Sequence, residues 1–128
     1  VSALRPKKPV VQPLQASVQA VAKAMAENRT DACLIVDELG RVVGIMSDND
    51  ITRRVVGAGL DAATTPAEDV MTPKPLCVSV EDDALEALGT MCTKRFRHLP
   101  VVDGVGQIVG VLDLAKCLYN TMERLERA

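Results

Sequence analysis

The spacing of hydrophobic positions changes along the chain and predicts a succession of elements. Residues 18–25 place apolar side chains at positions i, i+3, i+4 and i+7, the spacing of one helix face, and Ser17 precedes them as a candidate N-cap. Two short apolar runs follow, at residues 32–36 and 42–46, and the turn between them ends in Gly40, where a positive φ is easiest. This part of the chain is therefore predicted to form a helix followed by a β-hairpin.

The same pattern occurs twice along the chain. Shifting the sequence by 66 residues, from Asp37 to Asp103, aligns the two halves without a gap. The aligned pairs include Pro9 and Pro75, Met25 and Met91, Arg29 and Arg95, Gly40 and Gly106, and Gly44 and Gly110. Each half is predicted to contain an extended piece, a helix, a hairpin and a closing helix. Because one half alone would leave a sheet face poorly covered, we predict an α+β fold in which two β-α-β-β-α motifs pack as a pseudo-twofold pair.

The repeat divides the chain into four predicted segments. Residues 1–8 are expected to be an N-terminal linker, residues 9–60 the first motif, residues 61–74 a connector, and residues 75–128 the second motif with a long C-terminal helix. That helix carries an apolar seam, predicted to be core or a homodimer interface, of Leu114, Leu118, Met122 and Leu125.

Composition removes several function classes. A net charge of −2 and only two aromatic residues, Phe96 and Tyr119, argue against nucleic-acid binding. No apolar run approaches the roughly 20 residues that span a membrane, so no membrane association is expected. The four cysteines lie far apart among apolar residues, without Cys-x-x-Cys spacing, and His98 is the single histidine. We therefore expect no metal site, reduced buried thiols, and an intracellular, cytoplasmic location.

No catalytic signature is found in the sequence. It contains no Ser-His-acid set, no metal-ligand cluster and no phosphate-binding loop with its lysine. We predict a non-catalytic module that requires no cofactor. Since the chain begins at Val1, we also expect a processed chain or an excised fragment.

Several segments carry a family resemblance. Residues 33–51, CLIVDELGRVVGIMSDNDI, residues 97–103, RHLPVVD, and the preceding DVMTP at 69–73 resemble the cystathionine-β-synthase (CBS) motif. Tandem CBS motifs form a Bateman module, and the resemblance covers almost the whole chain. FRHLPVVD at 96–103 and LDLAKCLY at 112–119 further resemble a eukaryotic, mainly plant and algal, subgroup that carries CBS pairs ahead of a Phox/Bem-type domain. The resemblance implies a regulatory piece beside a regulated domain.

The resemblance also implies a ligand. Many Bateman modules bind AMP, ADP or ATP, or less favoured here S-adenosylmethionine, in clefts between the two motifs. The family pattern Gly-h-x-[Ser/Thr]-x-x-[Asp/Asn], in which h is apolar, is matched by Gly44, Ser47 and Asp50. By resemblance, Asp50 accepts hydrogen bonds from the ribose hydroxyls and Ser47 contacts ribose or the α-phosphate. A carboxylate suits this role because it accepts two hydroxyl donors at once.

The resemblance assigns further contacts to both motifs. Backbone near Ala32 and Cys33 is expected to read the adenine edge, and Arg97 and His98 are expected to face the phosphates. Asn49 stands where relatives often have a basic residue, and the candidate replacements one turn later are Arg53 and Arg54.

The second motif departs from the pattern. Asp113 replaces the Ser/Thr, and Lys116 replaces the ribose-binding Asp. Because a lysine only donates hydrogen bonds, Lys116 cannot accept from a ribose diol. We predict that the second motif is silent for nucleotides or adapted to another ligand.

Other readings of the same residues stay open. Ser47 and Asp48 can simply cap the helix that follows, whereas Asp50 has less structural reason to be there because Asp is a poor helix former. The alternative function is a structural or dimerisation module of a larger protein without a ligand. A weaker hypothesis is a redox or metal site that uses the cysteines.

Overall fold

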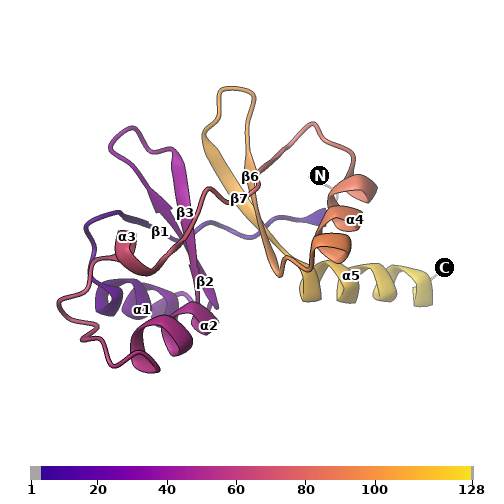
Figure 1. The fold of residues 1–128 in the computed structure, drawn as a ribbon. Helices are drawn as coiled ribbons and strands as arrows, with labels where there is room; N and C mark the ends of the chain where they lie inside the picture. The colour runs from indigo at the N-terminus through magenta and orange to yellow at the C-terminus, as the bar shows by residue number, and fades with distance from the viewer. Residues whose placement is uncertain (1–3, 128) are drawn as a thin grey trace. The chain divides into compact units, whose positions relative to one another are not determined.

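The computed structural model describes residues 4–127 and divides the chain into two compact units (Figure 1). The motif-1 unit is Pro9–Pro75, and the motif-2 unit combines Leu76–Ala128 with Val1–Lys8. Each unit contains its own β-sheet and helices, so the predicted α+β class is confirmed. No helix within residues 4–127 combines the length and the apolar character needed to cross a membrane.

The motif-1 sheet has the strand order β1-β2-β3-β4. Strand β1 (Val11–Pro13) runs parallel to β2 (Ala32–Val36), which pairs antiparallel with β3 (Val42–Ser47) as the predicted hairpin. Strand β4 (Thr72–Pro73) completes the sheet beside β3.

Four helical segments accompany this sheet. Helix α1 (Val18–Glu27) begins where predicted, because the Ser17 side chain accepts the N–H of Ala20 at 3.1 Å. Helix α2 (Asp48–Ile51) starts directly after β3 and continues into the π-helical turn η2 (Thr52–Val56). Helix α3 (Ala67–Val70) lies in the predicted connector and precedes β4.

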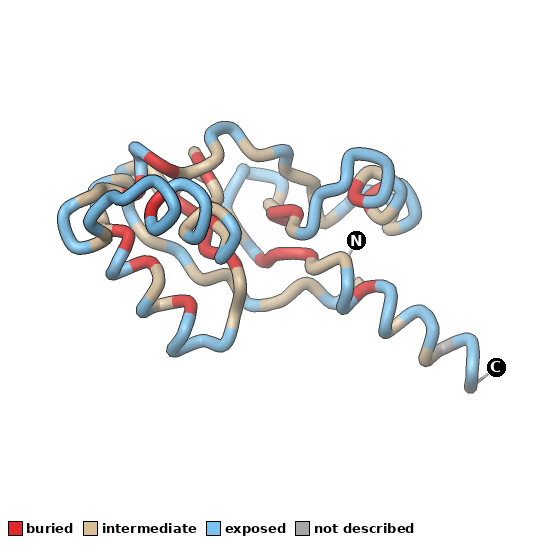
Figure 2. Tube along the Cα trace, turned by 60° about the horizontal axis from the view of Figure 1, so that its bottom comes forward, coloured by how far each residue is buried: buried red, intermediate tan, exposed pale blue. Residues whose placement is uncertain are grey.

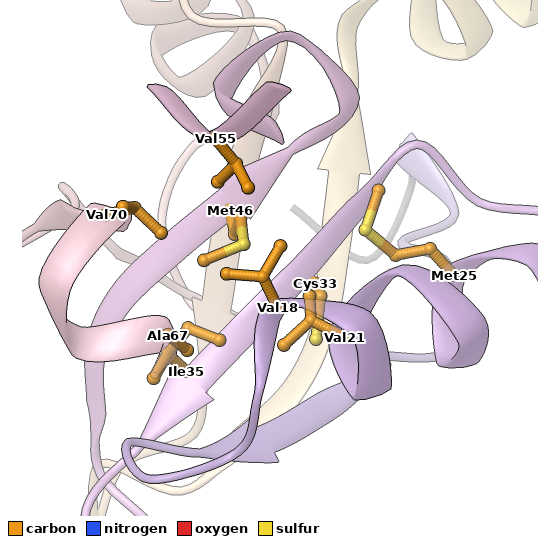
Figure 3. Close-up of a cluster of buried hydrophobic side chains, with 9 residues drawn as sticks. All are labelled: Val18, Val21, Met25, Cys33, Ile35, Met46, Val55, Ala67 and Val70. Atoms are coloured by element: carbon orange, nitrogen blue, oxygen red, sulfur yellow. The ribbon is translucent and has the colours of Figure 1, made fainter. Parts of the chain in front are cut away.

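The motif-1 core is made of aliphatic and sulfur-containing side chains, as the composition requires. Figure 3 shows its members gathered where α1, the sheet and α3 meet. They are Val18, Val21, Met25, Cys33, Ile35, Met46, Val55, Ala67 and Val70.

The motif-2 unit repeats this arrangement of strands and helices with a shorter parallel edge strand. Strand β5 (Val78–Ser79) pairs parallel with β6 (His98–Val102), which pairs antiparallel with β7 (Ile108–Asp113). Helices α4 (Ala84–Lys94) and α5 (Leu114–Arg127) supply the rest. The buried cluster consists of Ala87, Met91, Leu99, Val101, Leu112 and Cys117.

The 66-residue repeat extends to the backbone conformation. Arg29 and Arg95 both adopt left-handed conformations after their helices, with φ of 50° and 58°. Gly40 and Gly106 close the two hairpin turns with φ of 78° and 84°. The same register shift follows Ile35 in β2 and Val101 in β6. The sequence repeat is thus a repeat of local structure.

Segments predicted only as linker and connector take part in the sheets. The connector supplies β4, whose Pro73 lies opposite Gly44. In the motif-2 unit, Lys7 pairs with Val111 of β7: the N–H of Lys7 donates to the Val111 carbonyl at 2.8 Å, and the N–H of Val111 donates back at 3.0 Å. The N-terminal segment therefore has a structural role that its prediction as a linker did not include.

Two expectations about exposure need correction. Cys33 and Cys117 are buried, but Cys92 is exposed and Cys77 is half-buried, so the thiols are not uniformly core residues. Helix α5 is exposed over most of its length (Figure 2). Of the seam predicted as core or homodimer interface, Leu114 packs against the motif-2 core, whereas Leu118, Met122 and Leu125 are 42%, 63% and 72% exposed and are not core residues of their own unit.

Candidate functional site

A hydroxyl and a carboxylate meet where β3 runs into α2. The backbone N–H of Ser47 donates to Asp50 Oδ2 at 2.9 Å, and Ser47 Oγ lies 3.2 Å from the same oxygen. Ser47 Oγ in turn accepts the backbone N–H of Asp50 at 3.2 Å. This reciprocal arrangement is a capping box, which satisfies two donors that the helix start leaves open.

The capping box corrects the sequence-based view of Asp50. Ser47 and Asp48 were predicted as the capping residues, and Asp50 had little structural reason for its position. The structure shows instead that Asp50 is the reciprocal partner of Ser47. The spacing Ser-x-x-Asp before a helix was the signal that identifies such a box.

Asp50 is nevertheless positioned to do more than cap. Its side chain is 16% exposed, so it neither points into bulk water nor lies sealed in the core. Oδ2 serves the capping box, while Oδ1 lies 3.8 Å from Arg54 Nε. The carboxylate is therefore held in one orientation, with Oδ1 directed away from the cap.

Arg54 is committed to the protein backbone. Its Nη1 donates to the carbonyls of Val70 at 3.2 Å and Met71 at 3.1 Å, in addition to the approach of Nε to Asp50. Arg54 was predicted as a candidate phosphate partner. In the structure, its side chain connects η2 to the end of α3. Arg53, the other candidate, is exposed.

The predicted adenine-reading backbone lies beside Ser47, the capping partner of Asp50. Ala32 pairs directly with Ser47 in the sheet, and the N–H of Asp48 donates to the carbonyl of Asp31 at 3.0 Å. The Cys33 side chain points into the core, where burial raises the pKa of its thiol to about 12 (Figure 3). Cys33 is therefore a neutral thiol at physiological pH, and only its backbone is a candidate for ligand contact.

Gly44 has a packing explanation. It is buried in β3, and a Cβ added there would stand 2.2 Å from the sulfur of Met71. The Met71 side chain thus occupies the space that any larger residue at position 44 would need. A contact between Gly44 and ligand stays a prediction.

Arg97 and His98 belong to the motif-2 unit. His98 begins β6 opposite Asp113, its side chain is 6% exposed, and its Nε2 lies 3.9 Å from Asp113 Oδ2. Arg97 is exposed, and its carbonyl accepts the N–H of Leu114 at 2.8 Å. The structure brings Ala32, Ser47 and Asp50 together in one unit and places Arg97 and His98 in the other.

The equivalent position in the motif-2 unit is filled differently. Asp113 Oδ1 accepts the N–H of Lys116 at 3.1 Å, and Asp113 Oδ2 pairs with Lys7 Nζ at 3.2 Å. Burial alone would raise the pKa of Asp113, but the Lys116 N–H and the Lys7 ammonium, with a smaller effect of His98, hold it below its usual range. Sequence reasoning missed Lys7, because nothing in the repeat places residue 7 next to residue 113.

A surface pocket in the motif-1 unit lies elsewhere. It has a volume of about 370 Å³ and sits at the hairpin end of β2, whereas Ser47 pairs with Ala32 at the start of that strand. Asp37 at its rim accepts the N–H of Arg41 and of Leu39 and pairs with the Arg41 side chain, which lowers the pKa of Asp37. The pocket is lined by Pro13, Leu14, Gln15, Val36, Asp37, Glu38, Leu39 and Arg41.

Comparison with protein families gives a match to the CBS domain twice, at residues 3–57 and 67–120. The CBS domain-containing protein CBSCBSPB1 of Arabidopsis thaliana is 41% identical over 128 residues, which cover this whole chain and 23% of that protein. The meiotically up-regulated gene 70 protein of Schizosaccharomyces pombe is 36% identical over 123 residues, which cover 89% of this chain and 17% of that protein. The chain thus spans less than a quarter of the length of these curated relatives.

Comparison with solved structures gives the same result for the fold. The CBS domain protein PAE2072 from Pyrobaculum aerophilum, solved in complex with AMP, superposes with a TM-score of 0.81 at 31% identity, over 90% of this chain and 87% of that one. A protein with CBS domains from Burkholderia ambifaria superposes with a TM-score of 0.81 at 29% identity, over 92% of this chain and 85% of that one.

Proposed function

Because this chain belongs to the CBS domain family and carries the domain in tandem, we propose that it is a non-catalytic regulatory module that binds an adenosine nucleotide mainly through its first motif. The observation that carries the proposal is the oriented Asp50 carboxylate, which is partly open to solvent and is held by Ser47, the sheet partner of Ala32. The AMP complex of the similar Pyrobaculum protein supports the choice of ligand class.

The proposed chemistry follows from the geometry of Asp50. A ribose diol presents two hydroxyl donors, and the fixed carboxylate offers Oδ1 without breaking the Oδ2 bonds of the capping box. Charge-assisted hydrogen bonds of this kind are about twice as strong as neutral ones. Because the capping box already orders the side chain, binding would not have to supply that ordering free energy.

The phosphate contacts of the proposal are assigned to Arg97 and His98 by family resemblance alone. Arg54 is not assigned to the phosphates, because its guanidinium binds the carbonyls of Val70 and Met71. The proposal includes AMP, ADP and ATP as candidate ligands, and a titration series with the three nucleotides ranks their affinities.

The proposal extends to the protein's surroundings. The exposed α5 seam supports assembly as a homodimer. The small share of each curated relative that the chain covers supports an adjacent regulated domain, and we propose one of the Phox/Bem type in an intracellular protein.

Calorimetric titration with AMP, ADP, ATP and S-adenosylmethionine tests the nucleotide proposal. We expect saturable binding of an adenosine nucleotide by the wild type and at least about tenfold weaker binding by Asp50→Asn, since a carboxylate acceptor is replaced by an amide. Asn retains an acceptor for the Ser47 N–H, so the cap is preserved. Asp48→Asn removes the same charge from the exposed first position of α2 and is the matched control.

Four flat titrations would contradict the proposal and favour the second candidate function, a structural or dimerisation module without a ligand. The specific observation in favour of that candidate is the capping box, which accounts for Ser47 and Asp50 without any ligand. Thermal unfolding separates the two, because a ligand that binds only the folded state must raise the melting midpoint.

A further inference from the structure

We propose that Arg54 is a positioning residue that couples the Asp50 carboxylate to the chain segment at residues 70–74, through which the chain leaves the motif-1 unit. The coupling itself is a property of the ligand-free protein. One part of the proposal rests on the proposed nucleotide binding: that the coupling transmits the binding of a ligand at Asp50 to residues 70–74.

The first observation is that one guanidinium contacts two elements. Arg54 lies on η2, one helical turn after Asp50, and its Nε faces Asp50 Oδ1 at 3.8 Å. Nη1 of the same planar group reaches the carbonyls of Val70 and Met71, at the end of α3. The rigid fork of an arginine can hold these two directions together, whereas the single ammonium of a lysine is a point charge.

The second observation is that the segment after α3 is fixed to β3 at further points. The Met71 side chain fills the space beside Gly44, and Pro73 lies opposite Gly44 in the sheet. The N–H of Lys74 donates to the carbonyl of Val43 at 3.0 Å. The segment from Met71 to Lys74 thus lies along β3 as one continuous piece, and a displacement at Met71 is expected to reach Lys74 through it.

The two observations define an electrostatic balance at Arg54. The guanidinium is shared between a carboxylate and two carbonyls, and the arginine side chain is 48% exposed. When a hydroxyl donor takes Asp50 Oδ1, it competes with Arg54 for that oxygen, and Arg54 is left with the carbonyls. By linkage, whatever strengthens the hold on the carbonyls must also change the affinity of Asp50 for its ligand.

Amide hydrogen exchange followed by NMR on the full chain tests the coupling without a ligand. The reporters are the amides of Met71, bonded to the Ala67 carbonyl, and Lys74, bonded to the Val43 carbonyl. We expect Arg54→Met and Asp50→Asn each to speed exchange at Lys74 by roughly two- to fivefold, as for the loss of a partly exposed ion pair. The double variant should exchange no faster than Arg54→Met alone, because both changes break one connection.

Matched controls remove the same charges one or two residues away. Arg53→Met and Asp48→Asn should leave exchange at Lys74 within twofold of the wild type, since the coupling depends on contacts rather than on net charge. Arg54→Lys keeps the charge without the fork, and it should resemble Arg54→Met. It also serves as the test variant if Arg54→Met fails to fold.

The coupling is overturned if Asp50→Asn leaves Lys74 exchange unchanged while Arg54→Met raises it, or if the two effects add. In a second set of measurements, AMP should alter exchange at Lys74 in the wild type but not in Arg54→Met. If none of AMP, ADP and ATP binds the wild type, the nucleotide proposal fails, and the ligand-free measurements still decide the coupling.

Discussion

A single glycine in β3 is expected to carry a measurable part of the motif-1 stability. Replacing Gly44 by Ala brings a Cβ against the Met71 side chain, which is half-buried and has to rotate away. Overpacking typically costs about 1–3 kcal/mol, and we expect the lower end, about 1 kcal/mol, because the obstructing atoms belong to one flexible side chain. Urea unfolding of Gly44→Ala should therefore show a free energy of unfolding lower than that of the wild type by this amount.

Two further variants make the Gly44 prediction specific. Met71→Ala should make the Gly44→Ala change less costly, because the two side chains compete for one space. Gly89→Ala is the control: Gly89 lies inside α4, and nothing stands within 4 Å of its added Cβ. Removing a helical glycine should leave stability unchanged or raise it by about 0.5–1 kcal/mol. Equal destabilisation at both glycines would contradict the packing explanation.

At the scale of elements, the N-terminal segment is held to β7 by an ion pair that depends on pH. Folding lowers the pKa of Asp113, so the folded state binds that proton less readily than the unfolded state. The resulting stabilisation is complete above about pH 5 and is lost as the pH falls through the folded-state pKa, since an unfolded Asp titrates near pH ~3.9.

Unfolding free energies measured between pH 5 and pH 3 test this prediction. Asp113→Asn keeps an acceptor for the Lys116 N–H. Between pH 5 and pH 3, its free energy of unfolding should fall by up to about 1 kcal/mol less than that of the wild type. The free energy of unfolding of Lys7→Met should also fall less than that of the wild type over this range, because the variant lacks the ammonium that faces Asp113. Glu81→Gln, which neutralises an exposed carboxylate of the same unit, should follow the wild type. Parallel pH profiles for all four proteins would refute the prediction.

The elements that could be predicted from sequence are those with a side-chain period. Helix α1 and the two hairpins have one, because their apolar residues face a core. Strand β4 and the pairing of Lys7 with Val111 have none, because they depend on backbone hydrogen bonds over one or two residues. Nothing in the sequence of η2 distinguished a π-helical turn from an ordinary helix.

At the scale of the whole molecule, the same difference separates the predicted from the missed residues of the candidate site. Ser47 and Asp50 were found because a local motif contains both. Arg54 was predicted only as a phosphate candidate and Lys7 was not predicted at all, because their contacts involve partners 16, 17 and 106 positions away, in segments that carry no matching pattern. Local sequence reasoning could identify the carboxylates, but only the fold could show which cations face them.

The exposed seam of α5 leads to a prediction about assembly. Leu118, Met122 and Leu125 lie on one helix face and are 42%, 63% and 72% exposed, which is unusual for large apolar side chains grouped together. We expect sedimentation equilibrium to show a dimer of the wild type. Met122→Glu should weaken dimerisation at least tenfold, because it places a charge within the apolar contact. The control Lys116→Gln makes the same change in net charge on the opposite side of α5 and should remain dimeric. A monomeric wild type, or equal weakening by both variants, would exclude this face as the interface.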